Sequence, residues 1–186
     1  MRRPISQKTL LALIQRFTAV DAVGPSAVRG QRPKTAKKIQ GYLAKMNLRR
    51  IQRSSRRRFL RWVDLHTGRI QRNLGSSRKR WGVARKTLNL FLRSCFYNHD
   101  LREEYGLAKV GPWLEVPLDS VVARELRNDA GRGVLPRWEG VGRLKPKDSE
   151  EYQKHARAYA TACKLPATVF LDNYLWLRGR QRRTAQ

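Results

Sequence analysis

Apolar residues recur at steps of three and four positions along most of this chain, which is the spacing of one face of an α-helix. The segments with this spacing are 10–17, 35–46, 50–65, 84–98, 119–131, 148–162 and 168–177. No alternating apolar pattern longer than four residues is present, so the signal of a half-buried β-strand is missing from the sequence. We therefore expect an all-α fold.

Several polar residues and glycines predict where these helices begin and end. Ser6 and Asp119 each stand directly before an apolar-periodic segment, where a side-chain oxygen can cap the first amide groups of a helix. Gly131 is suited to end the helix that Asp119 begins, and the run 75–77 (Gly-Ser-Ser) interrupts the pattern. The stretch 98–115 contains two glycines and a proline, and we expect it to form a short helix and a loop that line a pocket.

The length of 186 residues fits one domain with a real core. Within this single domain, 1–186, we distinguish basic N-terminal helices over 1–74, a central region over 75–130 and C-terminal helices over 145–180. No repeat of fixed period and no low-complexity linker divides the chain.

The charge of the chain points to a polyanionic partner. It contains 41 Lys and Arg against 14 Asp and Glu, a formal net charge of +27. Between Arg29 and Lys86 there are 20 basic residues and a single acid, Asp64, which predicts one strongly basic face. Nucleic acid is the partner that such a face favours.

Other classes of protein and site are disfavoured by the sequence. No run of about 18 apolar residues could span a membrane, and the N-terminus lacks the apolar core of a secretory signal. We expect a cytosolic protein, in which Cys95 and Cys163 are buried, reduced thiols. The two cysteines and three scattered histidines have no metal-ligand spacing, so we expect no metal and no cofactor.

A lysine and an aspartate stand out as candidate catalytic residues. Lys86 ends the segment Gly82-Val83-Ala84-Arg85-Lys86, and Asp119 ends Val116-Pro117-Leu118-Asp119, 33 positions later. A carboxylate stabilises the positive charge that develops on a sugar when an N-glycosidic bond breaks. A partly desolvated lysine can attack the same sugar carbon and form a Schiff base. The two residue types therefore suit the removal of a base from DNA.

These two segments resemble the Gly-Val-Gly-x-Lys and Val-Pro-x-Asp segments of the helix-hairpin-helix DNA glycosylases, most closely those of the 8-oxoguanine branch. The resemblance covers roughly residues 75–180 and includes an aromatic-rich closing helix. Two departures are visible. Ala84 replaces the second hairpin glycine, and the interval between Lys86 and Asp119 is more than three helical turns longer than is usual in the family.

The resemblance implies an all-α helix-hairpin-helix fold and an enzyme that flips a modified base out of double-stranded DNA and excises it. Asp119 and Lys86 would be catalytic. Phosphate contacts are expected from basic side chains and from backbone amides at the start of the lysine-bearing helix. The residues of this expected phosphate clamp are Arg78, Lys79, Arg80, Gly82, Val83 and Arg85. Candidates to stack on the flipped base are Tyr97, Trp113 and Trp138. We expect the enzyme to act as a monomer in the bacterial cytosol or nucleoid.

The sequence leaves the substrate and two rival functions open. The excised base is either oxidised guanine, with or without strand cleavage by Lys86, or a hypermodified base such as glucosylated hydroxymethylcytosine, removed from phage DNA in antiviral defence. A basic DNA- or RNA-binding protein without chemistry is one rival function. A magnesium nuclease is the other, and would use acids drawn from Glu103, Glu104, Glu115 and Asp119.

A rival assignment of the motif is also open. The segment 140–143 (Gly-Val-Gly-Arg) is a second candidate glycine hairpin, and Asp172 would be its carboxylate. Fewer than 15 residues follow Asp172, so the helices that normally complete the domain behind the catalytic carboxylate would be missing. We therefore prefer Lys86 and Asp119.

Overall fold

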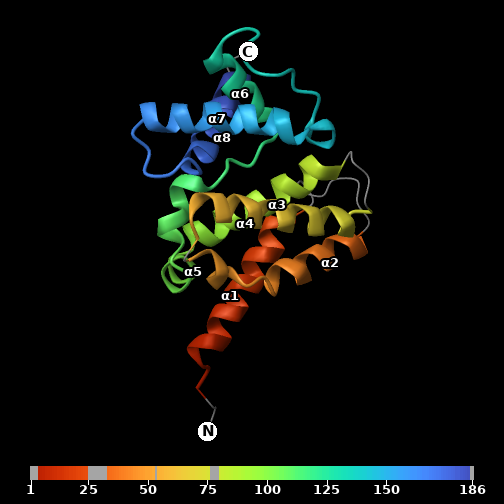
Figure 1. Ribbon diagram of the computed structural model, residues 1–186, viewed down its shortest axis with the longest axis vertical. Helices are drawn as coiled ribbons and strands as arrows, with labels where there is room; N and C mark the ends of the chain where they lie inside the picture. Colours follow the sequence, from red (N-terminus) through yellow and green to blue (C-terminus); the bar gives the residue numbers. More distant parts are fainter. Residues whose placement is uncertain (1–3, 25–32, 53, 76–79, 185–186) are drawn as a thin grey trace.

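The computed structural model describes residues 4–24, 33–52, 54–75 and 80–184, and these ranges contain helices and no strand (Figure 1). The expected all-α class is confirmed. The α-helices are α1 (Gln7–Ala22), α2 (Pro33–Ala44), α3 (Arg56–Asn73), α4 (Trp81–Tyr97), α5 (His99–Glu104), α6 (Ser120–Ala130), α7 (Pro146–Ala162) and α8 (Phe170–Thr184). Short 3-10 helices are η1 (Leu48–Ile51), η3 (Leu107–Trp113) and η4 (Val141–Arg143).

The capping residues begin the helices as their chemistry requires. The Ser6 hydroxyl accepts a hydrogen bond from the Thr9 amide at 3.2 Å, and Asp119 is the N-cap of α6. The third helix begins later than the pattern over 50–65 predicts. Ser55 caps α3, and the residues before it form η1, because this tighter turn buries both Leu48 and Ile51.

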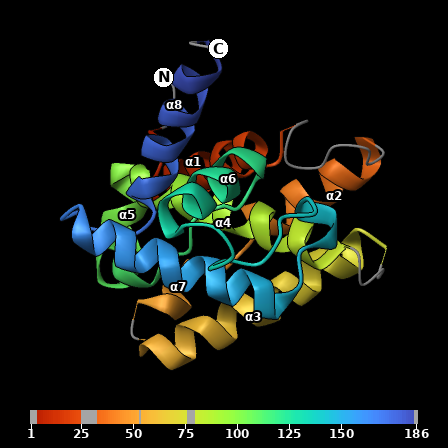
Figure 2. The same cartoon turned by 90° about the horizontal axis from the view of Figure 1, so that it is seen from above.

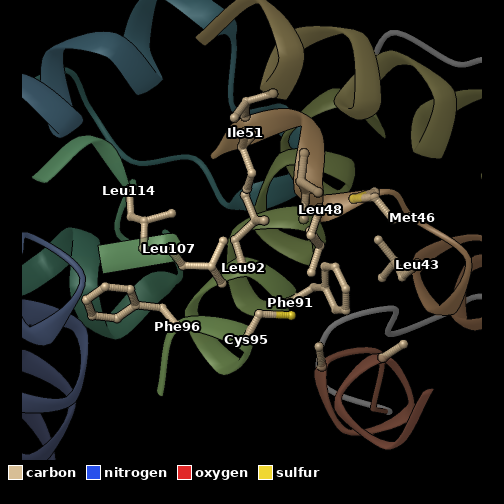
Figure 3. Packing of buried hydrophobic residues seen from close by; sticks show 14 of the residues in the cluster. Leu43, Met46, Leu48, Ile51, Phe91, Leu92, Cys95, Phe96, Leu107 and Leu114 are labelled. Carbon is tan, nitrogen blue, oxygen red and sulfur yellow. The ribbon is translucent and has the colours of Figure 1, made fainter. Parts of the chain in front are cut away.

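The helices up to residue 114 form an N-terminal lobe around one apolar core. Figure 3 shows side chains from α2, η1, α4 and η3 meeting in this core, with Phe91 of α4 fully buried among them. In Figures 1 and 2, α4 runs through the middle of the molecule and α3 lies beside it. Because the sequence of α4 is apolar over most of its length, this helix can be buried on several sides.

The three last α-helices form a C-terminal lobe, which lies above the N-terminal lobe in Figure 1. Its separate apolar cluster includes Val122 and Leu126 of α6, Tyr152 of α7, and Leu171 and Leu175 of α8. The segment 115–119 passes from one lobe to the other, and α4 contacts both η4 and α7. The junction between the lobes therefore brings α4 next to the start of α6.

As expected from its glycines, the stretch 98–115 contributes to cavities: Glu115 lines one at this junction, and α5 lines another. It forms α5 and η3, whose residues Leu107, Val110 and Gly111 are buried in the N-terminal lobe. A Cβ atom at Gly111 would lie 2.8 Å from the ring of Phe96, so the glycine permits close packing. The extra length between Lys86 and Asp119 thus enlarges the core.

The two cysteines differ in their surroundings. Cys95 is buried, and burial raises the pKa of its thiol well above the usual value. Cys163 is exposed at the end of α7, so the expectation that it is buried is wrong. Among the described residues, no helix is long and apolar enough to cross a membrane.

Candidate active site

Lys86 and Asp119 meet at the junction of the two lobes. The Nζ atom of Lys86, on α4, lies 4.0 Å from Oδ2 of Asp119, at the start of α6. Their side chains are 12% and 29% exposed, so the pair is partly desolvated and open to solvent on the side of the carboxylate. The structure therefore brings the two residues singled out in the sequence into one site.

The carboxylate of Asp119 is held by the helix that it caps. Its Oδ1 atom accepts hydrogen bonds from the amides of Val121 and Val122, both at 2.9 Å. The positive end of the α6 dipole also favours a negative charge at this position. Because Oδ1 is committed to the helix, Oδ2 is the oxygen that is presented to Lys86.

A second ion pair adjoins the first. Arg93 follows Lys86 by two turns on the same face of α4, and its Nη1 donates to Oδ2 of Asp172 on α8. Burial raises the pKa of Asp172 and Arg93 lowers it, while the charge of Asp119 raises it and that of Lys86 lowers it. The four residues, which we call the charge quartet, are thus electrostatically coupled, and the sequence did not reveal that Arg93 and Asp172 belong with the first pair.

The glycine segment 140–143 does not form a rival hairpin for Asp172. It contains η4, which covers the first turn of α4 at Gly82. A Cβ atom at Gly82 would lie 2.7 Å from Cβ of Leu144 and closer still to the carbonyl oxygen of Val141. Gly82 is buried by this contact, so the expectation that it approaches a DNA phosphate is wrong for this structure.

Replacing Gly82 with alanine is expected to destabilise the protein by about 1–3 kcal/mol, because η4 must move away from α4. Gly68→Ala on α3 is the matched control: its Cβ would meet only the flexible end of Arg72, at 3.9 Å. That change should stabilise the helix by roughly 0.5–1 kcal/mol. Urea unfolding of both variants measures the two free energies, and a neutral Gly82→Ala would contradict the tight contact.

Arg85 was expected to bind DNA phosphate, and the structure shows that it is a buried structural residue. Its Nε and Nη2 atoms donate to the two oxygens of Glu115, both at 2.7 Å, and Nη1 donates to Asp64 at 2.7 Å and Thr67 at 3.1 Å. The side chains of Arg85 and Glu115 are only 8% and 10% exposed. Four of the five N–H donors of the guanidinium are used in these bonds, within the protein.

The Arg85–Glu115 pair helps to place Asp119. Glu115 stands four residues before Asp119, and Arg85 ties it to α4 directly beside Lys86. On the other side, the Gln153 amide of α7 binds both the N–H and the C=O of Val116, at 2.9 and 2.8 Å. These bonds attach the segment that carries Asp119 to both α4 and α7, which sets the distance between the two candidate catalytic groups.

The other members of the expected phosphate clamp are only partly described. Arg78 and Lys79 lie outside the described residues, so their expected role stays a prediction. Arg80 is the N-cap residue of α4 and is half-buried, as is Val83 in the first turn of the helix.

Two of the three aromatic candidates are partly buried and pack against the core of the N-terminal lobe. The Tyr97 ring is stacked on Phe170, with centroids 5.3 Å apart, and its hydroxyl donates to the carbonyl of Val169 at 3.1 Å. Burial raises the pKa of Tyr97 to about 12. Trp113 packs against Phe59 in the N-terminal lobe. Both residues are only partly buried, and their expected role in receiving a flipped base stays a prediction.

Trp138 is the aromatic candidate that lies beside the site. Its Nε1 donates to the hydroxyl of Ser120, the residue after Asp119, at 3.3 Å. The ring also packs edge-on against Tyr152 and lines a cavity of about 200 Å³. Neither Lys86 nor Asp119 lines this cavity, and of the two side chains that of Asp119 is the more exposed.

The acids expected for a nuclease do not converge. Glu103 and Glu104 are on α5 in the N-terminal lobe, where Glu104 pairs with Arg49, whereas Glu115 is bound to Arg85. In the described ranges, no group of three or more histidines, cysteines and acids is arranged to hold a metal ion. The charge of Asp119 raises the pKa of Asp172.

Comparison of the chain with models of protein families, with curated proteins and with solved structures found no match.

Proposed function

We propose that this protein is a DNA glycosylase that excises a modified base from double-stranded DNA by cleaving its N-glycosidic bond. The observation that carries the proposal is the 4.0 Å approach of Lys86 Nζ to Asp119 Oδ2 at the junction of the lobes. The two residues are 33 positions apart in the sequence, yet the fold brings them together. The proposed reaction requires an amine and a carboxylate at the same sugar, and this pair supplies both.

In the proposed reaction, Asp119 stabilises the positive charge on the sugar as the bond to the base lengthens. The Lys86 amine forms a bond to the sugar carbon, and the base leaves with the electron pair of the broken bond. Oδ2 of Asp119 accepts the proton that Lys86 loses, and a proton from solvent neutralises the departing base. Opening of the sugar ring then gives a Schiff base on Lys86, which water hydrolyses to leave an abasic site.

The charge of the surface supports DNA as the partner. Arg56, Arg57, Arg58, Arg61 and Arg69 are all exposed along α3. Such a row of cations releases counterions from a phosphate backbone, and this gives affinity without sequence preference. The binding energy can offset the few kcal/mol that are needed to unstack one nucleotide.

An assay for alkali-labile sites tests the proposal and identifies the base. Duplexes containing 8-oxoguanine, glucosylated hydroxymethylcytosine or unmodified bases are incubated with the protein in EDTA and, in parallel, with magnesium. We expect release of one modified base and no action on unmodified DNA. Cleavage that requires magnesium would support the nuclease instead, and binding without release of any base would support a non-catalytic DNA-binding protein.

Borohydride trapping tests the proposed role of Lys86. Reduction during turnover should give a covalent protein–DNA adduct, because it converts a Schiff base to a stable amine. The adduct should be absent in Lys86→Gln. Base release without any adduct would show that water, and not Lys86, attacks the sugar.

A further inference from the structure

A larger cavity lies between α3 and the first turns of α4 and α7, and we call it the α3–α7 cavity. Its volume is about 380 Å³, and neither Lys86 nor Asp119 lines it. Figures 1 and 2 both place α7 next to α3 across the junction of the lobes. A cavity of this volume falls in the range of small-molecule sites.

Three basic side chains line this cavity without an acid to bind them. Arg56 comes from α3, and Lys147 and Arg157 come from α7. Among the described residues, none of the three side chains makes a hydrogen bond or an ion pair. Arg157 is half-buried, where a guanidinium has lost part of its hydration and has gained no acceptor in return.

The positive charge of Arg56 opposes that of Arg157. Burial lowers the pKa of Arg157, and repulsion from Arg56 lowers it further, while Glu115 and Glu150 partly compensate. Of the acids that line the cavity, Asp64 and Glu115 are bound to Arg85, and Glu150 is exposed. The arrangement of Arg56 and Arg157 is therefore unfavourable in the protein alone, and an anion between them would relieve it.

We propose that the α3–α7 cavity binds a phosphate group through Arg56, Lys147 and Arg157. Two arginines from different helices can offer forked donors to the oxygens of one phosphate, and a lysine adds a point charge. The first turn of α7 faces the same cavity, and its amides have no side-chain cap from Lys145. The phosphate belongs either to a free phosphate monoester or to the DNA backbone. Neither of the proposed catalytic residues, Lys86 and Asp119, is part of this site.

The variant Arg157→Gln tests the site with inorganic phosphate as the probe. Without phosphate, this variant should melt at a temperature equal to or above that of the wild type, because it removes an unpaired, half-buried charge. Phosphate at about a hundredfold excess over its Kd should raise the Tm of the wild type by roughly 5 °C, relative to chloride at equal ionic strength, and leave the variant unchanged.

Arg127→Gln is the matched control, since Arg127 is an exposed arginine of α6 outside the cavity. It should respond to phosphate as the wild type does. Equal stabilisation of all three proteins by phosphate would overturn the proposal, because it would show general exclusion of phosphate from the surface. Exposed Arg56→Gln tests the same site from α3 if Arg157→Gln does not fold, and it should also lose the response.

To identify the source of the phosphate, the affinity of the protein for unmodified duplex DNA is measured at several salt concentrations. If the backbone supplies it, Arg157→Gln should lower the slope of log K against log salt by about one relative to Arg127→Gln. An unchanged slope together with a lost response to inorganic phosphate indicates a free phosphate monoester. A variant that keeps both properties overturns the proposal. None of these readouts involves base release, so failure of the glycosylase assay leaves them intact.

Discussion

The change Asp119→Asn is expected to reduce the rate of base release by at least about 10²–10³-fold while the protein stays folded. The amide cannot supply the negative charge that stabilises the sugar in the transition state, nor can it accept a proton from Lys86. Asparagine is as good an N-cap as aspartate, and its oxygen can keep the hydrogen bonds to the amides of Val121 and Val122. The change therefore separates the proposed catalytic role of Asp119 from its structural role at the start of α6.

Single-turnover base release and thermal unfolding measure these two roles in the same samples. Asp129→Asn is the matched control: it removes an acid from the other end of α6, where Asp129 pairs with His155. This control should keep its activity. If Asp119→Asn released base within tenfold of the wild-type rate, the carboxylate would not be catalytic. If it also unfolded, its loss of activity would show only that the N-cap is needed for the fold.

The change Arg85→Met is expected to lower the free energy of unfolding by about 3–5 kcal/mol, because it leaves the Glu115 carboxylate buried without its partner. For a chain of this length, that corresponds to a fall in Tm of roughly 10 °C. Arg61→Met, at an exposed position of α3, is the control and should change stability by less than about 0.5 kcal/mol. A change of similar size in both variants would contradict a structural role for the pair. Urea unfolding at neutral pH measures the difference.

The stability that Glu115 contributes should depend on pH. Burial alone would raise the pKa of Glu115, but the charge and hydrogen bonds of Arg85, with a hydrogen bond from Asn89, lower it below its usual range. A folded-state pKa below the unfolded value of about 4.3 stabilises the protein above that pH, and this stability is lost as the pH falls through the folded-state pKa. The double variant Arg85→Met with Glu115→Leu should recover much of the stability and lack this acid-sensitive part. Urea unfolding between pH 7 and pH 3 compares it with the wild type.

Much of the helical architecture could be predicted from the sequence because the responsible interactions are local. The apolar spacing predicted the helices, and Ser6 and Asp119 begin α1 and α6 as their capping chemistry predicts. The predicted start of α3 was too early. The sequence does not show that the residues before Ser55 are more stable as η1, which buries Leu48 and Ile51, than as a first turn of α3. The stability of η1 comes from the contacts of these two side chains with helices that are distant in the sequence.

The candidate site was predictable only in part, for a related reason. A motif resemblance indicated Lys86 and Asp119, but their 4.0 Å separation depends on the bonds that Glu115 and Val116 make to α4 and α7. No feature of the neighbouring sequence indicates that Arg85 is buried while Lys86, the next residue, belongs to the candidate site. Both are basic residues on one helix, and only the neighbouring helices distinguish them.

The sequence by itself determined the helices, several of their caps and the large positive charge, because these follow from the spacing and chemistry of neighbouring residues. The tertiary structure decided which charged groups meet. It paired Arg85 with Glu115, joined Arg93 and Asp172 to the charge quartet, and left Arg157 half-buried without a hydrogen-bond or ion-pair partner among the residues that the structure describes. The physical reason is that the burial of a side chain and the charges around it depend on residues distant in the sequence, whereas the spacing that forms a helix does not.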